Sequence, residues 1–222
     1  ESDGVTAVSE SLKNDTYNEF EILSHIEVIP NFIDLHRFQK RPHDHFKKTL
    51  CPNGEKLLMH TSNFRKVKRI QDIVKVFALV RKKIPAKLVL IGDGPERSGI
   101  EVLCRELEVQ NDVRFLGKMD GIEEALSLAD LFLLTSEKES FGLAALEAMA
   151  CEVPVISSNA GGIPEVNIHG VTGFVSEIGD VNDMAANAIK MLSDPILHDK
   201  MKANALKRAQ EFDIVKILPL YE

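Results

Sequence analysis

Short apolar runs alternate with helical segments from residue 56 to residue 192, and this alternation restricts the fold more than any other feature. Six runs have the length and apolar character of strands that are buried on both faces of a parallel sheet. They span residues 56–60, 87–91, 113–116, 131–134, 153–156 and 173–176. This pattern predicts right-handed strand–helix–strand units in a Rossmann-like, doubly wound α/β fold. Ligands of such folds bind at the carboxyl ends of the strands.

Between these runs, apolar side chains recur every three or four residues, which indicates helices with one buried face. The first such set is Ile70, Ile73, Val74, Phe77, Val80 and Ile84. The same spacing predicts further helices over 100–107, 122–129 and 181–192. Each helix lies between two predicted strands or follows the last of them, as a doubly wound sheet requires.

The segment before residue 56 is less regular. Its pattern predicts strands over 5–9 and 25–29 and a helix over 10–20, for which Ser9 or Ser11 is a suitable N-cap. Asparagine, aspartate, proline and glycine recur over residues 31–54, so we expect an irregular linker there.

Charge and composition exclude several classes of protein. The chain has 34 acidic and 27 basic residues and a net charge of -7, which argues against a nucleic-acid partner. No apolar run approaches the ~20 residues that span a bilayer, so we expect no membrane insertion. Three scattered cysteines argue against a disulfide framework and favour the cytoplasm. The sequence has no clear carboxylate cluster for a metal ion, so we expect neither a metal nor another cofactor. The oligomeric state, including a homo-oligomer, stays open.

The clearest candidate site follows the apolar run 131–134. Ser140, Phe141, Gly142 and Leu143 precede or open a helix there, and Ser140 is its expected N-cap. The free N–H groups of a helix start attract phosphate. Glu139 and Glu147 are eight positions apart, or roughly 10 Å along the axis, which matches a nucleotide-sugar passing the helix start. A solvated helix surface is the simpler explanation of the pair. However, Glu147 lies among alanine, leucine and methionine, where a carboxylate is costly without a partner.

A basic loop follows the run 56–60 and carries Arg65, Lys66, Lys68 and Arg69. Arginine can bind a diphosphate with two hydrogen bonds, and lysine adds a mobile charge. Most charge runs are only solvated loops, but this one lies at the carboxyl end of a predicted strand.

Three weaker signals lie at other strand ends. Gly92 and Gly94 permit a tight turn and close approach of a ligand to the backbone, although a plain turn explains them equally well. Lys118 follows a strand where a base could meet the backbone. The pair Gly161-Gly162 could expose N–H groups or form only a turn before a helix.

Together these segments resemble the retaining GT-B glycosyltransferases of family four, over nearly the whole chain. The motifs that carry the resemblance are SNFRKVKR, GDGP, RFLGKMD, SEKESFGLAALEAMACEVPVI and GGIPEV. The block that contains Glu139 and Glu147 is highly specific for that superfamily. The resemblance implies the carboxy-terminal, donor-binding half of a GT-B enzyme. Because the cations of the basic loop can neutralise the diphosphate, we expect no metal ion. The wording of SNFRKVKR and EKESFGL is most similar to members that act in bacillithiol biosynthesis.

The family's site residues transfer to this sequence by motif. Arg65, Lys68 and Glu139 take catalytic roles: the two cations bind the donor diphosphate, and Glu139 contacts sugar hydroxyls. The resemblance implies the following donor-binding residues: Glu147 at the ribose, backbone groups of Ser140, Phe141, Gly142 and Leu143, Lys118 and Met119 at the uracil, and Gly92 and Gly94. Many relatives carry Gly-Arg where this chain has Ser62-Asn63, so Arg65 replaces the usual arginine, and Arg69 is an alternative to Lys68.

The resemblance also implies a reaction and a division of the chain. The reaction is transfer of N-acetylglucosamine from UDP-N-acetylglucosamine to L-malate with retention, giving UDP. Residues 1–30 are expected to end an amino-terminal acceptor domain, 31–210 to bind the donor, and 211–222 to begin a returning helix. Malate would then contact a domain outside this sequence, without which the chain would be inactive. Three alternatives stay open: a related transferase with another sugar or acceptor, a nucleotide-sugar epimerase or hydrolase, and a binding module without activity.

Overall fold

The computed structural model describes residues 4–41 and 44–221. Residues 1–3, 42–43 and 222, which the expected domain ranges include, lie outside the described residues. The strands are β1 (Val5–Ala7), β2 (Ile26–Val28), β3 (Lys56–Thr61), β4 (Ala86–Ile91), β5 (Val113–Gly117), β6 (Leu131–Leu134), β7 (Val155–Ser158) and β8 (Gly173–Ser176). The α-helices are α1 (Glu10–Glu19), α2 (Asp44–Leu50), α3 (Ile70–Arg81), α4 (Arg97–Glu106), α5 (Ile122–Leu126), α6 (Leu143–Ala150), α7 (Ile163–Val166), α8 (Val181–Ser193), α9 (Pro195–Ala209) and α10 (Ile214–Ile217). Short 3-10 turns span Lys66–Lys68, Gln210–Phe212 and Leu218–Tyr221.

Strands β3 to β8 form one parallel sheet in the order β5-β4-β3-β6-β7-β8. The chain therefore winds outward from β3 to one edge and then returns to continue from β6 to the other edge. The predicted doubly wound α/β fold is confirmed. The reversal lies between β3 and β6, and such switch points are where open α/β sheets bind ligands.

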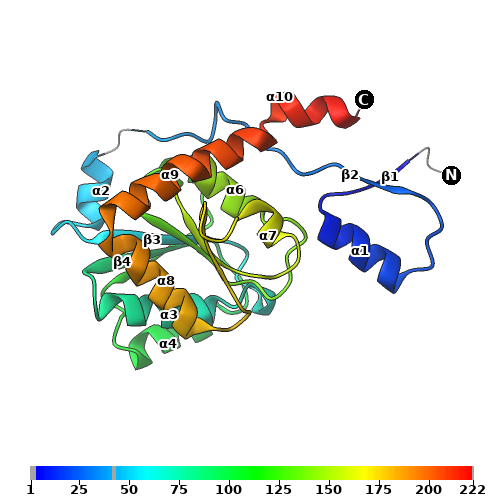
Figure 1. The fold of residues 1–222 in the computed structure, drawn as a ribbon. Helices are drawn as coiled ribbons and strands as arrows, with labels where there is room; N and C mark the ends of the chain where they lie inside the picture. The colour runs from blue at the N-terminus through cyan, green and yellow to red at the C-terminus, as the bar shows by residue number, and fades with distance from the viewer. Residues whose placement is uncertain (1–3, 42–43, 222) are drawn as a thin grey trace.

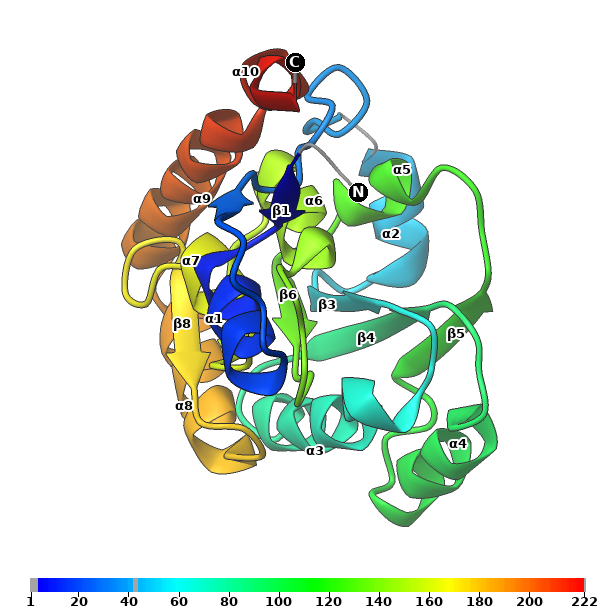
Figure 2. The same cartoon turned by 90° about the vertical axis from the view of Figure 1, so that its right-hand side faces the viewer.

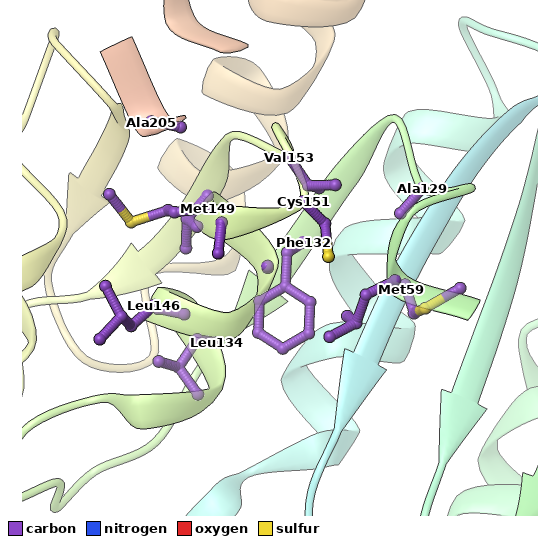
Figure 3. Packing of buried hydrophobic residues seen from close by; sticks show 14 of the residues in the cluster. Met59, Ala129, Phe132, Leu134, Leu146, Met149, Cys151, Val153 and Ala205 are labelled. Atoms are coloured by element: carbon purple, nitrogen blue, oxygen red, sulfur yellow. The ribbon is translucent and has the colours of Figure 1, made fainter. Parts of the chain in front are cut away.

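Successive side chains of the central strands enter different cores, because a strand alternates its faces. Leu58, Leu131 and Leu133 pack with α3, α4 and α8 on one face. Met59 and Phe132 pack with α5, α6 and α9 on the other. Figure 3 shows Phe132 in this second core between Met59 and the α6 segment. Both faces are covered, which explains why these strands are continuously apolar.

The first strands and helix form a small unit beside the main sheet. Strands β1 and β2 pair in parallel, and α1 joins them. Figures 1 and 2 show this unit next to α7, away from the helices that cover the sheet. Ser9 caps α1 as expected, by accepting a hydrogen bond from the N–H of Leu12 at 3.0 Å. The Ser9 hydroxyl also donates to the carbonyl of Ser140 at 2.6 Å, so the unit contacts the candidate site loop.

Two expectations about secondary structure were wrong. Residues 31–54 are not uniformly irregular, because α2 forms from Asp44 to Leu50 and its Lys47 pairs with Asp130 at 2.9 Å. The strand expected over 153–156 lies at Val155–Ser158 instead. Residue Pro154 is apolar like the strand, but it has no N–H group to donate to a neighbouring strand.

Candidate functional site

A pocket of about 260 Å³ opens at the switch point between β3 and β6. The ends of both strands and the first turn of α6 form it. Its lining residues are Thr61, Ser62, Asn63, Lys68, Leu134, Glu139, Gly142, Leu143, Ala144 and Glu147. The structure thus brings five of the predicted site residues together from two separate segments of the chain, the loop of Lys68 and residues 139–147.

Lys68 and Glu139 form the charged part of the pocket. The Lys68 ammonium donates to the Glu139 carboxylate at 2.6 Å, and both side chains are mostly buried. Two contacts between their loops fix this geometry. The N–H of Glu137 donates to the carbonyl of Val67 at 2.9 Å, and the Thr135 hydroxyl donates to the carbonyl of Lys68 at 3.1 Å. The ammonium is therefore held at the mouth of the pocket beside an acceptor carboxylate.

Arg69, the alternative to Lys68, is engaged elsewhere. It adopts a left-handed backbone with φ of 49° and caps α3. Its guanidinium pairs with the buried Asp72 at 2.6 Å and with Glu137 at 3.6 Å. Among the lining residues of the pocket, Lys68 is present and Arg69 is absent. The geometry therefore favours Lys68 as the cation for a ligand.

The pair Gly161-Gly162 packs against the backbone of the Glu139 loop. The N–H of Gly162 donates to the carbonyl of Glu139 at 2.9 Å. A Cβ at Gly161 would lie 2.0 Å from that same carbonyl oxygen, and φ at Gly161 is +51°. These glycines serve backbone packing against the site loop rather than direct lining of the pocket.

The start of α6 supplies hydrogen-bond donors. Gly142 caps the helix with φ of +98°, a conformation that favours glycine, so the expectation that Ser140 caps it was wrong. The N–H groups of Leu143 and Ala144 have no protein partner among residues 4–41 and 44–221. Because both residues line the pocket, their N–H groups and the helix dipole favour an anion there. Phe141 is buried and stacks edge-on against Phe212, with ring centroids 5.5 Å apart.

Glu147 lies one turn further along α6 and lines the same pocket. Burial raises the pKa of its carboxyl group to about 7 from an ordinary 4.5, and the negative charge of Glu123 adds to this, while Arg37 opposes it. In the described part of the chain, no hydrogen bond or ion pair to this carboxylate is found. A half-buried carboxylate without a partner is a natural acceptor for ligand hydroxyl groups.

The raised pKa of Glu147 makes stability depend on pH. The native carboxyl group holds its proton more tightly than the unfolded one, so the free energy of unfolding should fall between pH 4.5 and about 7. The Glu147→Gln variant lacks this titration. We expect it to be more stable than the wild type at pH 8, by on the order of 2 kcal/mol, and to converge with it near pH 4.5. Urea denaturation at several pH values measures this, with Glu106→Gln on the exposed side of α4 as the control. A constant difference across pH would contradict the burial of a charge at Glu147.

Several predicted residues do not line the pocket. Arg65 is exposed at the start of the 3-10 turn, and Lys118 and Met119 are exposed after β5. Gly92 and Gly94 face the backbone instead: a Cβ at Gly92 would lie 1.8 Å from the Ser62 carbonyl oxygen, and one at Gly94 would lie 2.6 Å from that of Phe64. These glycines let the turn after β4 pack against the loop that carries the pocket residues Ser62 and Asn63.

Thr61, Ser62 and Asn63 line the pocket and His60 is buried next to them, although none of the four was predicted as a site residue. Their position could have indicated them, because His60 and Thr61 end β3 and Ser62 and Asn63 follow it, at a strand that borders the switch point. Thr135 was also missed, although its hydroxyl orients the Lys68 backbone.

Two features are absent from the residues that the structure describes. In 4–41 and 44–221, no group of three or more His, Cys, Asp or Glu side chains is arranged to hold a metal ion. Over the same ranges, every helix is too short or too polar to cross a membrane.

A parallel sheet with a pocket at its switch point is typical of α/β proteins that bind a ligand at the carboxyl ends of the strands. Residues 43–208 match the family described as "Glycosyl transferases group 1". The chain belongs to this glycosyltransferase family. The predicted family and its GT-B fold are confirmed.

Curated relatives agree with this assignment. The N-acetyl-alpha-D-glucosaminyl L-malate synthase of Bacillus anthracis is 47% identical over the whole chain, which covers 59% of that protein. A glycogen synthase of Mycobacterium tuberculosis is 30% identical, over 96% of this chain and 51% of its own length. The chain thus spans about half to three fifths of the length of these relatives.

Solved structures show the same fold. HepE of Anabaena, in complex with UDP and glucose, superposes with a TM-score of 0.91 at 25% identity, over 98% of this chain and 61% of HepE. Sucrose-phosphate synthase of Thermosynechococcus elongatus gives a TM-score of 0.88 at 26% identity, over 100% of this chain and 57% of the synthase.

Proposed function

We propose that the pocket at the switch point binds the UDP part of a sugar donor and that the protein transfers N-acetylglucosamine from UDP-N-acetylglucosamine to L-malate. One observation supports the donor-binding site: a single pocket combines the Lys68 ammonium, the free N–H groups at the start of α6, and the Glu139 and Glu147 carboxylates. The 47% identity to a malate synthase supports the sugar and the acceptor, and the complex of HepE with UDP supports the nucleotide.

In this proposal each group meets the part of the donor that its chemistry suits. Lys68 and the N–H groups of Leu143 and Ala144 bind the diphosphate, because they are donors beside a positive helix end. Glu139 accepts hydrogen bonds from sugar hydroxyls, and Glu147 accepts them from the ribose. Arg65, exposed at the rim, is a second cation for the diphosphate.

Lys118 and Met119 are proposed to contact the uracil, and only the family resemblance supports this role. Ser140, Phe141 and Gly142 contribute through the backbone that leads into α6.

The chemistry of transfer follows from charge. As the bond between the sugar and UDP breaks, negative charge develops on the diphosphate. Lys68 and the start of α6 lie ready to stabilise it, which is the electrostatic catalysis of an oxyanion site. These groups supply positive charge without a metal ion. Retention of configuration requires the acceptor to attack the face from which UDP departs, and the departing phosphate can take the acceptor proton.

We propose a matching division of the chain. Residues 31–210 bind the donor, and residues 1–30 and 211–222 lie toward the acceptor-binding part, since Ser9 of the first segment contacts the loop of Glu139 and Ser140. Three buried cysteines, Cys51, Cys104 and Cys151, are free thiols, which fits a cytoplasmic location.

A transfer assay tests the function. The full-length protein, given UDP-N-acetylglucosamine and a panel of hydroxy acids, should release UDP rapidly with L-malate and form an α-glycoside. UDP release that needs no acceptor would indicate a hydrolase or epimerase. UDP release with another hydroxy acid alone would contradict the malate assignment and keep the donor assignment.

A further inference from the structure

His60 is a buried titratable group at the pocket that the proposed reaction does not use. It lies in β3 with none of its surface exposed, and its ring stacks on Phe132 with centroids 6.0 Å apart. Both ring nitrogens have partners. Nδ1 lies 2.8 Å from the carbonyl oxygen of Leu133, and Nε2 lies 2.7 Å from the hydroxyl oxygen of Ser62.

These partners determine the tautomer of His60. A carbonyl oxygen only accepts, so Nδ1 must carry the hydrogen that it donates to Leu133. Burial lowers the pKa of His60 to about 4, the positive charge of Lys68 acts in the same direction, and the bond to Leu133 opposes them. The ring is therefore neutral at physiological pH, and Nε2 carries no hydrogen. It follows that the Ser62 hydroxyl donates its proton to Nε2.

The direction of this hydrogen bond decides what Ser62 offers a ligand. Ser62 lines the pocket, and its only hydroxyl proton is already used. Its remaining capacity is to accept, through its lone pairs. Ionised phosphate oxygens also only accept, so they gain nothing from Ser62. A ligand hydroxyl or amide N–H donates, and it therefore complements this residue.

The position of the pair favours the sugar end of the donor. Lys68 is the charged side chain whose field acts on His60, and its ammonium bonds to Glu139. Glu139 and Glu147 are the acidic groups that line the pocket. Ser62 and Glu139 are then two acceptors that line the same pocket, where hydroxyl groups would be recognised.

We propose that Ser62 determines specificity by accepting a hydrogen bond from a hydroxyl or amide N–H of the donor sugar, with His60 as the positioning residue that keeps Ser62 an acceptor. This inference rests on the proposed function, because it assumes a nucleotide-sugar in the pocket. It gives a role to Ser62, to which the resemblance assigns none.

Calorimetric titration with UDP and with UDP-N-acetylglucosamine tests the role of Ser62. In Ser62→Ala, we expect the affinity for UDP-N-acetylglucosamine to fall roughly three- to tenfold, since one neutral hydrogen bond is lost. The affinity for UDP should stay within about twofold. Ser127→Ala is the control, because the Ser127 hydroxyl likewise donates to a protein acceptor, the Glu124 carbonyl, and Ser127 does not line the pocket. Equal weakening of both ligands by Ser62→Ala would overturn the inference.

His60→Asn tests the positioning role. Asparagine can still donate to Leu133, but it removes the acceptor that holds the Ser62 proton. The preference for UDP-N-acetylglucosamine over UDP should then fall, because Ser62 becomes free to donate to phosphate. Titration in buffers of different ionisation enthalpy adds a second measurement, namely proton uptake on binding UDP. Proton uptake should be equal in the wild type and in His60→Asn. Because both proteins keep Glu147, their comparison also cancels any proton that Glu147 takes up.

Two results separate this inference from the proposed function. Proton uptake that His60→Asn abolishes would mean that His60 becomes charged and Ser62 donates to the phosphate, which contradicts the inference alone. Absence of UDP binding by the wild type would contradict the proposed function, and the inference would fail with it. Ser62→Ala keeps His60 in place, so its result stands even if His60→Asn does not fold.

Discussion

Replacing Lys68 with methionine should lower turnover of the full-length protein by roughly a hundredfold to a thousandfold. Methionine keeps most of the length of the side chain but removes the ammonium that lies 2.6 Å from Glu139 at the pocket mouth. In the proposed reaction that ammonium stabilises the charge that develops on the diphosphate. The loss should appear mainly in kcat, since charge is greater in the transition state than in the bound donor.

The matched control is Lys66→Met. Lys66 belongs to the same basic loop but is exposed and does not line the pocket, so its turnover should stay within about twofold of the wild type. Steady-state rates with UDP-N-acetylglucosamine and L-malate measure both variants. Similar rates in Lys68→Met and Lys66→Met would remove Lys68 from the mechanism. A large loss in both would mean that the charge of the loop matters more than the position of one ammonium.

The second large effect is expected at Gly161. Alanine there would place a Cβ 2.0 Å from the Glu139 carbonyl oxygen, in a backbone with φ of +51°. Either the Gly161 turn or the site loop must move. We expect Gly161→Ala to lower the free energy of unfolding by about 3 kcal/mol, from strain and overpacking together. Its turnover should also fall, because Glu139 and its bond to Lys68 are displaced.

Gly121→Ala separates strain from collision. Gly121 also has a left-handed backbone, with φ of +69°, but a Cβ there would meet no atom within 4 Å. We expect it to cost only about 1 kcal/mol and to leave turnover unchanged. Urea denaturation of both variants gives the comparison. Equal costs at the two glycines would show that the Glu139 loop yields easily and that Gly161 does not position it.

Most of the fold could be predicted because periodicity reports burial. The predicted strand 131–134 has the same bounds as β6. A run of four apolar side chains bounded by turn residues is too short for a helix, so it predicts a buried strand. α2 could not be predicted in this way. Proline and asparagine around Asp44–Leu50 suggested a loop, while the helix is held by a contact between Lys47 and Asp130, 83 positions apart. Such tertiary contacts override local propensity.

The site was predictable to the extent that strand ends converge. Glu139, Glu147 and Lys68 were expected together, and they line one pocket. Side-chain direction was not predictable: spacing could not distinguish the pocket residue Lys68 from Arg69, which pairs with Asp72. The role of Gly92 also required coordinates, because its close neighbour is a backbone atom of Ser62, from a different loop.

A crystal structure with bound UDP tests the donor pocket most directly. Its diphosphate should lie within hydrogen-bond distance of the Lys68 ammonium and of the N–H groups of Leu143 and Ala144, with the ribose hydroxyls on the Glu147 carboxylate. UDP seated at another surface, with these groups unoccupied, would contradict the assignment of the switch-point pocket as the donor site.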